Sequence, residues 1–245
     1  MIIGGLEKFS LIDYPGHLAA IVFTSGCNFR CHFCYNPMLV EPGRISSSDD
    51  KEKGRSLGTG FNQIQESDLF EFLQTRVGKI DAVVVTGGEP TLHHDLPEFI
   101  KKLKDLGFKV KLDTNGTNPQ ALKNLLEQSL IDYIAMDIKG PFEKYDLVVG
   151  AQINKDDLAE TISLIKASGL SYEFRSTIVP GLHEFDDVAK MGEMIKGAQK
   201  WFLQPFKSDV ELVNNAFKNA TTYSDADMEK MCEVGKMYVD FCEVR

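Results

Sequence analysis

The 245-residue chain has no uninterrupted apolar run of about 18 residues, the length that suggests a membrane-spanning helix. Its start, MIIGGLEKFS, lacks the basic region and apolar centre of a signal peptide. Basic residues are scarce as well: 27 Lys and Arg stand against 36 Asp and Glu, a formal charge of −9. A nucleic-acid-binding surface needs a basic face. We therefore expect a cytoplasmic protein that binds neither membranes nor nucleic acids.

Cysteine is rare and unevenly placed. There are five cysteines, and three of them, Cys27, Cys31 and Cys34, lie within eight positions. An odd, clustered set does not suit a disulfide framework. In a reducing compartment, clustered thiols more often bind metal or take part in catalysis. The other two, Cys232 and Cys242, are expected to be buried and structural.

Short β-rich runs alternate with amphipathic stretches along the chain. Strands are predicted at Ala19–Thr24, Ala82–Thr86, Lys109–Asp113, Tyr133–Asp137, Tyr172–Thr177 and Trp201–Pro205. Helices are predicted near Ser67–Val77, Asp95–Leu106, Asn154–Ser168, Phe185–Lys196 and Ser224–Met237, with one more opened by Asn118 and Pro119. Six βα units predict an α/β fold, a barrel that is open or partly closed, in a single domain over residues 1–245. The stretch 42–60, rich in Ser, Gly and charge, is expected to be a surface insertion.

The cysteine cluster has the pattern Cys27-x3-Cys31-x2-Cys34 and follows directly after the first predicted strand. The carboxyl ends of parallel strands form the functional face of such folds. Thiolates suit zinc or an iron–sulfur cluster. A structural zinc ion normally has four ligands, so a zinc site here would need His32 or a distant cysteine. Three thiolates on a four-iron cluster would leave one iron open to another ligand, and both alternatives stand at this point.

Polar residues follow the other predicted strands. Gly87 and Gly88 allow close approach to backbone groups, and the carboxylate of Glu89 suits a ligand ammonium. The later strands are accompanied by Asp113, Thr114 and Asn115, then Asp137 and Lys139, and finally Arg175. Each of these has an ordinary explanation, such as a helix cap or an ion pair. Together they gather at the edge that carries the cysteines, which predicts a ligand site there.

These residues carry a resemblance to a known family. The cysteine segment, with Phe33 before the third cysteine, resembles the cluster loop of radical S-adenosylmethionine (SAM) enzymes, and the GGEP turn at 87–90 resembles their SAM-methionine motif. The segments GLEKFSLIDYPG (5–16), DTNG (113–116), MDIK (136–139) and FRSTIVPG (174–181) are similar to glycyl-radical-enzyme activases. Among activases, the chain most resembles those of anaerobic ribonucleoside-triphosphate reductase. The resemblance covers nearly the whole chain except 42–60.

The resemblance implies a partial (β/α)6 TIM-like barrel in which Cys27, Cys31 and Cys34 hold a 4Fe-4S cluster. SAM would chelate the fourth iron and be cleaved reductively to methionine and a 5′-deoxyadenosyl radical. That radical would take hydrogen from a glycine of a partner enzyme, here anaerobic ribonucleotide reductase. The electron donor would be flavodoxin or ferredoxin.

The resemblance also implies roles for single residues. Gly87, Gly88 and Glu89 would hold the methionine ammonium of SAM. Lys139 and Arg175 would face its carboxylate or ribose, and Phe33 its adenine. Asp113, Thr114 and Asp137 match positions that bind a monovalent cation in related activases, and Asn115 belongs to the same SAM-binding segment.

Two other functions stay open from the sequence. A radical SAM enzyme that acts on a small molecule would carry the same motifs. A non-catalytic zinc or iron–sulfur electron-transfer protein would explain the cysteines, but it does not account for the GGEP turn, the Asp137–Lys139 pair or Arg175.

Overall fold

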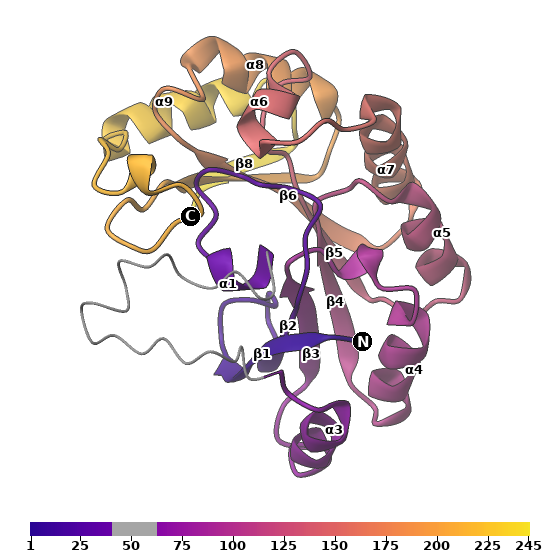
Figure 1. Cartoon of the computed structure of the whole chain (residues 1–245). Coiled ribbons are helices and arrows are strands. Elements are labelled where there is room, and N and C mark those ends of the chain that lie inside the picture. The colour runs from indigo at the N-terminus through magenta and orange to yellow at the C-terminus, as the bar shows by residue number, and fades with distance from the viewer. Residues whose placement is uncertain (41–62) are drawn as a thin grey trace, which may run out of the picture.

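The computed structural model describes residues 1–40 and 63–245, so the expected insertion at 42–60 lies outside the described residues. The described chain forms one eight-stranded sheet whose spatial order follows the sequence order (Figure 1). Its strands are β1 (Ile3–Ser10), β2 (Ala19–Thr24), β3 (Ala82–Gly87), β4 (Lys109–Thr114), β5 (Tyr133–Asp137), β6 (Ser171–Ile178), β7 (Lys200–Pro205) and β8 (Phe241–Val244). The six predicted strands are confirmed as β2 to β7, and the α/β partial barrel with them.

The predicted helices are also present. The described helices are α1 (Pro37–Val40), α3 (Glu66–Gln74), α4 (Leu96–Asp105), α5 (Pro119–Glu127), α6 (Tyr145–Val149), α7 (Lys155–Ala167), α8 (Phe185–Met194) and α9 (Asp225–Gly235), with short 3-10 turns η1 (Pro90–Leu92) and η2 (Asn215–Phe217). Asn118, Asn154 and Ser224 cap α5, α7 and α9 by accepting a backbone N–H. The helices from α3 to α9 form an arc around one side of the sheet (Figure 1). In the described ranges, none combines the length and apolar character needed to cross a bilayer.

The strand β1 differs from the others and was not predicted. It pairs antiparallel with β2, whereas all later neighbours are parallel. Its burial does not alternate, so the usual strand signal is missing. Gly5 lies opposite Phe23, and a Cβ at Gly5 would come within 3.4 Å of the Phe23 ring. Since β1 and β8 are the two ends of the strand order, the barrel is open between them.

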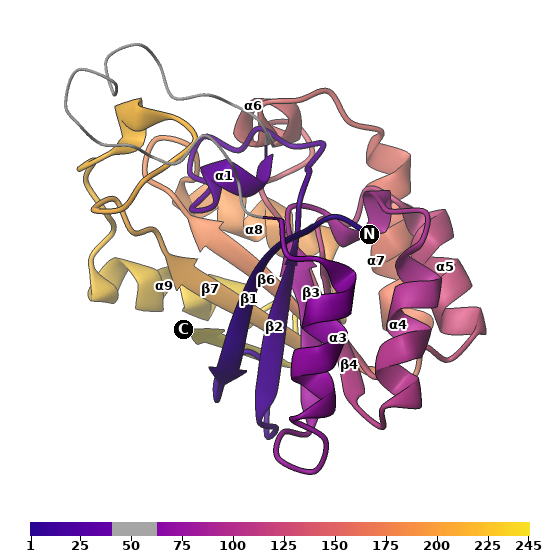
Figure 2. The same cartoon turned by 60° about the horizontal axis from the view of Figure 1, so that its bottom comes forward.

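Alternate residues of each strand face opposite sides of the curved sheet. Val83 and Val85 of β3 belong to the large core shared with the helices, which also contains Leu69 and Phe99. The intervening residues face the inside of the barrel, where a second, small core consists of Tyr14, Ala19, Ile21, Ala82, Val84 and Tyr133. The cysteine loop and α1 lie at the end of the sheet opposite to the arrowhead of β1 (Figure 2). This end is the carboxyl edge of the parallel strands.

Candidate functional site

The three cysteines lie in the loop that follows β2. Cys31 is buried, and Cys27 and Cys34 are partly buried. The Phe29 N–H points at the Cys27 sulfur, with N and Sγ 3.4 Å apart. Burial raises the pKa of Cys27 to about 11 and that of Cys31 to about 12, and the neighbouring thiols add to this while Lys139 opposes it. The thiols therefore need a strongly positive group beside them to become thiolates.

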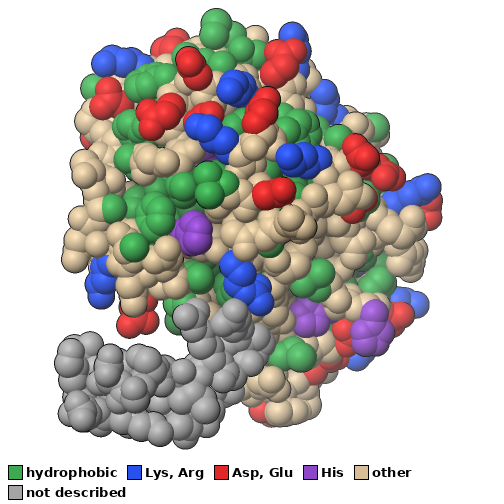
Figure 3. Space-filling model, turned by 45° about the horizontal axis from the view of Figure 1, so that its top comes forward, with side chains coloured by type: hydrophobic (Ala, Val, Ile, Leu, Met, Phe, Trp, Pro, Cys, Tyr) green, Lys and Arg blue, Asp and Glu red, His purple; other side chains and the backbone are tan. Residues whose placement is uncertain are grey.

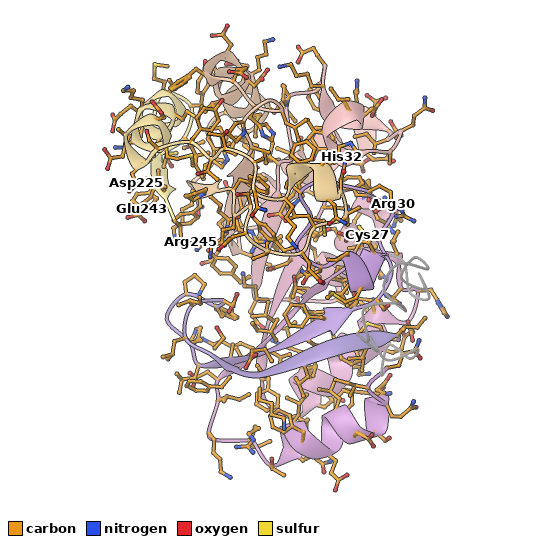
Figure 4. The ribbon with its side chains drawn as sticks, turned by 60° about the vertical axis from the view of Figure 1, so that its left-hand side comes forward. Cys27, Arg30, His32, Asp225, Glu243 and Arg245 are labelled. Atoms are coloured by element: carbon orange, nitrogen blue, oxygen red, sulfur yellow. The ribbon has the colours of Figure 1, made fainter. Side chains whose placement is uncertain are left out.

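The outer side of the cysteine loop is covered by the segment that follows β7. Backbone N–H groups of Val213 and Asn214 donate to the carbonyls of Cys34 and His32, at 3.2 and 3.1 Å. The His32 ring stacks on Phe217 of the 3-10 turn η2, with ring centroids 5.8 Å apart, and Figure 4 shows His32 beside this turn. The His32 ring thus contacts the segment that follows β7, through Phe217 and Asn214.

Gly87, the last residue of β3, and Gly88 pack directly on the base of the cysteine loop. Gly87 has φ +119°, and a Cβ there would lie 2.3 Å from the Thr24 nitrogen. A Cβ on Gly88 would lie 2.0 Å from the Gly26 carbonyl oxygen. The Glu89 N–H donates to the same oxygen at 2.8 Å. In this structure the close neighbour of these glycines is backbone of the chain itself, which fixes the turn against the loop. The approach of a ligand to Gly87 and Gly88 stays a prediction.

Glu89 joins this turn to the segment after β4. Its side chain is buried, and Oε1 accepts hydrogen bonds from Thr91 and from the Thr114 hydroxyl, the latter at 2.7 Å. Its Oε2 accepts from the Asn115 N–H at 2.6 Å. The Asn115 side chain in turn donates to Asn28 Oδ1 in the cysteine loop at 2.8 Å. The GGEP turn, the DTNG segment and the cysteine loop therefore form one connected unit.

Charged side chains from β4, β5 and β6 meet inside the barrel. Arg175 donates from Nε to Asp137 Oδ1 at 2.9 Å and from Nη1 to Asp113 Oδ2 at 3.0 Å. The Lys139 Nζ lies 3.0 Å from Asp137 Oδ2. Burial alone would raise the pKa of Asp113 and Asp137, but the adjoining cations hold both below the ordinary aspartate value. Four predicted site residues are thus brought together as ion pairs.

Two charged residues of this group were missed from the sequence, Lys111 and Glu173. Both are almost fully buried, and Lys111 Nζ lies 2.9 Å from Asp113 Oδ1 and 3.9 Å from Glu173 Oε1. Glu173 also meets Arg245 Nη2 at 2.9 Å. The available signal was the strand period: Lys111 precedes Asp113, and Glu173 precedes Arg175, by two positions.

The backbone of Lys139 is held by two further residues, His183 and Tyr145. The buried His183 accepts from the Val179 N–H at Nδ1 (3.0 Å), so its Nε2–H donates to the Lys139 carbonyl at 2.7 Å. The Lys139 N–H donates to the Tyr145 hydroxyl at 3.2 Å. Burial lowers the pKa of His183, in keeping with a neutral ring. Phe33 is buried and lies edge-on to His183, with ring centroids 6.3 Å apart.

Cys232 and Cys242 are buried away from this site, as expected. Cys232 lies on α9 and Cys242 on β8, and Gly235 of α9 packs against both the Cys242 sulfur and the Trp201 ring. Among the residues that the structure describes, no group of three or more His, Cys, Asp or Glu side chains is placed to hold a metal ion.

By its chemistry the donor set of the cysteine loop suits an iron–sulfur cluster, although the three thiols are not arranged around one metal ion in the described structure. Three thiols lie on one loop, and an N–H already points at the sulfur of Cys27. Hydrogen bonds to sulfur are a common means of tuning such clusters. Two buried hydroxyls at the base of the loop, on Thr24 and Ser25, have no hydrogen-bond partner in the described ranges.

The comparisons with known proteins agree with this geometry. The model of the radical SAM superfamily matches residues 21–195, which span β2 to α8 and include the three cysteines. The chain belongs to the radical SAM superfamily. Membership implies a 4Fe-4S cluster and SAM.

Two named proteins are similar in sequence to this radical SAM enzyme over most of its length. A Methanocaldococcus jannaschii protein, named provisionally as a glycyl-radical enzyme activating enzyme, is 30% identical over 100% of this chain and 95% of its own length. The pyruvate formate-lyase-activating enzyme of Streptococcus mutans is 27% identical over 84% of this chain and 77% of its own.

Solved structures share the fold of this radical SAM enzyme. Streptococcus suis SuiB bound to SAM has a TM-score of 0.62 at 13% identity, covering 92% of this chain and 51% of SuiB. A domain of a pyruvate-formate lyase-activating enzyme from Bacteroides vulgatus has a TM-score of 0.54 at 13% identity, covering 67% of this chain and 99% of that domain. The chain thus spans about half the length of SuiB. At these identities the likeness concerns the fold alone.

Proposed function

We propose that this radical SAM enzyme generates a glycyl radical on a partner enzyme. The observation that carries the proposal is the full-length similarity, at 30% identity, to a protein named as an activating enzyme of this kind. The partner we propose is anaerobic ribonucleotide reductase, because the segments at 5–16, 113–116, 136–139 and 174–181 resemble the activases of that enzyme most closely.

The cluster and SAM have proposed ligands in this chain. Cys27, Cys31 and Cys34 would hold the cluster, which leaves one iron for the amino and carboxylate groups of SAM. When bound, the cluster would supply one electron to the sulfonium of SAM. Lys139, whose charge lowers the pKa of Cys27 and Cys31, would stabilise negative charge at the cluster.

The remaining residues would hold and orient SAM. Gly87, Gly88 and Glu89 would bind its methionine ammonium; Glu89 Oε2 accepts only one of the hydrogen bonds described above, which leaves capacity for another. Lys139 and Arg175 would face the carboxylate or ribose, with Phe33 near the adenine and Asn115 fixing the segment after β4. The resemblance also implies a monovalent cation at Asp113, Thr114 and Asp137, but the proposed function does not depend on it.

The proposed reaction balances with one electron. SAM and an electron give methionine and a 5′-deoxyadenosyl radical; the radical takes a hydrogen atom from the partner's glycine, leaving 5′-deoxyadenosine and a glycyl radical. The residues of this chain would position SAM. Their ion pairs would keep these side chains in place while the positive charge of the sulfonium is lost.

The partner and the electron donor would bind from outside. On the face shown in Figure 3, acidic and basic side chains are interspersed, and apolar side chains are exposed between them. Such mixed surfaces are common in non-obligate protein interfaces. We propose flavodoxin or ferredoxin as the donor, and a cytoplasmic location, where clustered thiols stay reduced.

The test uses the reconstituted protein, SAM, a reductant and purified anaerobic ribonucleotide reductase. We expect 5′-deoxyadenosine to form and a glycyl radical signal to appear on the reductase by electron paramagnetic resonance. Cys31→Ala should lose the cluster absorption and both products, while the matched variant Cys232→Ala keeps them. SAM cleavage without any radical on the reductase would favour a small-molecule substrate, and a protein that takes up one zinc and never cleaves SAM would end the enzyme proposal.

A further inference from the structure

The two aspartates proposed to bind a monovalent cation already contact cationic side chains at every carboxylate oxygen. Asp113 Oδ1 lies 2.9 Å from Lys111 Nζ, an ion pair without hydrogen-bond geometry, and its Oδ2 lies 3.0 Å from Arg175 Nη1. Asp137 Oδ1 lies 2.9 Å from Arg175 Nε, and its Oδ2 lies 3.0 Å from Lys139 Nζ. A free cation at these oxygens would have to share them with buried ammonium and guanidinium groups already in contact, and the like charge of those groups opposes it.

The third proposed ligand, Thr114, is directed elsewhere. Its hydroxyl donates to Glu89 Oε1 at 2.7 Å and accepts from the Gly116 N–H at 3.1 Å. The buried Thr114 therefore belongs to the Glu89 contacts and not to the group formed by the two aspartates. The donor set that would favour a hard cation, several open oxygens, is not assembled here.

The balance of charge leads to the same conclusion. Three cationic side chains, Lys111, Lys139 and Arg175, meet two carboxylates, which leaves one positive charge in excess. Glu173 lies farther from Lys111, at 3.9 Å, and is itself paired with Arg245. An added cation would increase the excess in a buried place, whereas the carboxylate of SAM would cancel it.

Lys111 is the residue that makes the difference. It is 2% exposed, and besides its pair with Asp113 its ammonium donates to the Asp13 carbonyl at 2.7 Å. Its Nζ also lies 5.8 Å from the centre of the Tyr133 ring. The ammonium is therefore held by the Asp13 carbonyl of the N-terminal segment as well as by Asp113.

We propose that Lys111 and Arg175 stand in for the monovalent cation, so that this enzyme neither binds nor requires one. The inference rests on the proposed function in placing SAM at this site. Lys111 is accordingly a positioning residue: it supplies the charge that keeps Asp113 in place without touching SAM.

The first experiment compares salts on the wild-type protein. SAM cleavage is measured in potassium, sodium and choline chloride at equal ionic strength, and the rates are expected to agree within twofold. The thermal unfolding midpoint of the cluster-free protein should likewise not depend on which cation is present. Thallium-205 NMR should show no saturable broadening on adding protein. Saturable binding of thallium, or a rate at least fivefold higher in potassium than in choline, would overturn the proposal.

The second experiment removes the built-in charge. Lys111→Met should bind thallium and show a midpoint that rises saturably with potassium or sodium but not with choline, since Asp113 then lacks a cation on Oδ1. Lys109→Met, an exposed position two residues away on the same strand, is the matched control and should behave as the wild type. Failure of folded Lys111→Met to gain any cation dependence would overturn the role of Lys111.

The two proposals can fail separately. Loss of SAM cleavage in every salt would refute the proposed function, while the unfolding and thallium measurements need neither cluster nor SAM. Should Lys111→Met not fold, the wild-type thallium measurement still decides whether a free cation binds.

Discussion

The inside of the barrel has two halves of opposite character. The half formed by β2 and β3 is lined by small apolar side chains, Ala19, Ile21, Ala82 and Val84. The half formed by β4, β5 and β6 is lined by charge: Lys111, Asp113, Asp137, Glu173 and Arg175. In both halves every second residue of a strand faces inward. Tyr14 and Tyr133 pack between the halves, with ring centroids 5.5 Å apart.

The difference between the halves shows that the chain confines its buried charges to the half formed by β4, β5 and β6. A buried charge is costly unless it is paired, and in the second half the described carboxylates meet cationic partners at 2.9 to 3.0 Å. The first half contributes no charge, and it carries the cysteine loop at its carboxyl edge. The cysteine loop and the buried charges are thus supplied by different strands of the sheet.

The largest effect is expected from placing a charge in the apolar half. Ile21→Asp would bury a carboxylate in the small core, and its neighbours in register, Glu7 and Val84, carry no positive charge. We expect the free energy of unfolding to fall by about 5 kcal/mol, as measured by urea denaturation. Ile21→Ala, the control, should cost only about 3 kcal/mol, from lost apolar burial. Equal losses in the two variants would show that the halves do not differ in their tolerance of charge.

Removing a charge from the polar half should have the next largest effect. Arg175→Met would leave Asp113 Oδ2 and Asp137 Oδ1 without their cation. Breaking a buried pair from one side costs about 3–5 kcal/mol, and SAM cleavage should be lost as well. Urea denaturation measures the first and product analysis the second. A loss of stability below about 1 kcal/mol would mean that the aspartates are well solvated.

The polar half should also make stability depend on pH in the acid range. Asp113 and Asp137 have pKa values below the ordinary one, so the unfolded chain takes up protons first as the pH falls. Their contribution is complete above the unfolded pKa of about 4 and is lost as the pH drops below it towards the folded values. Urea denaturation between pH 3 and 7 should show this decline, and Asp113→Asn should make it shallower. An unchanged slope in Asp113→Asn would contradict the assignment.

The smallest effect is expected at the border of the two halves. The Tyr133 hydroxyl donates to Glu173 Oε2 at 3.0 Å, and Glu173 keeps Arg245 when that hydroxyl is removed. Tyr133→Phe should therefore lower the free energy of unfolding by about 1–2 kcal/mol. The variant should leave the apolar packing against Tyr14 intact. A loss above about 3 kcal/mol would indicate that the ring itself moves.

Much of the fold and part of the site can be predicted from the sequence. The strands β2 and β5 were predicted to the residue, because apolar β-branched runs end sharply at polar turns. Lys111 was missed because a lysine two positions before an aspartate can equally well point to solvent, and the sequence alone does not show which face of the strand is buried. Glu173 was missed because its partners Lys111 and Arg245 lie outside its own strand. For the same reason, the hydrogen bonds of Glu89 to Thr114 and Asn115 could only be found in three dimensions.

The segment that packs over the cysteine loop is synthesised long after the loop itself. The contacts of Tyr35 with Lys207 and of His32 with Asn214 join residues 172 and 182 positions apart. A ribosome that proceeds from the N-terminus exposes the three cysteines long before it completes the segment that packs over them. A donor of iron and sulfide would therefore meet the nascent loop uncovered during that interval.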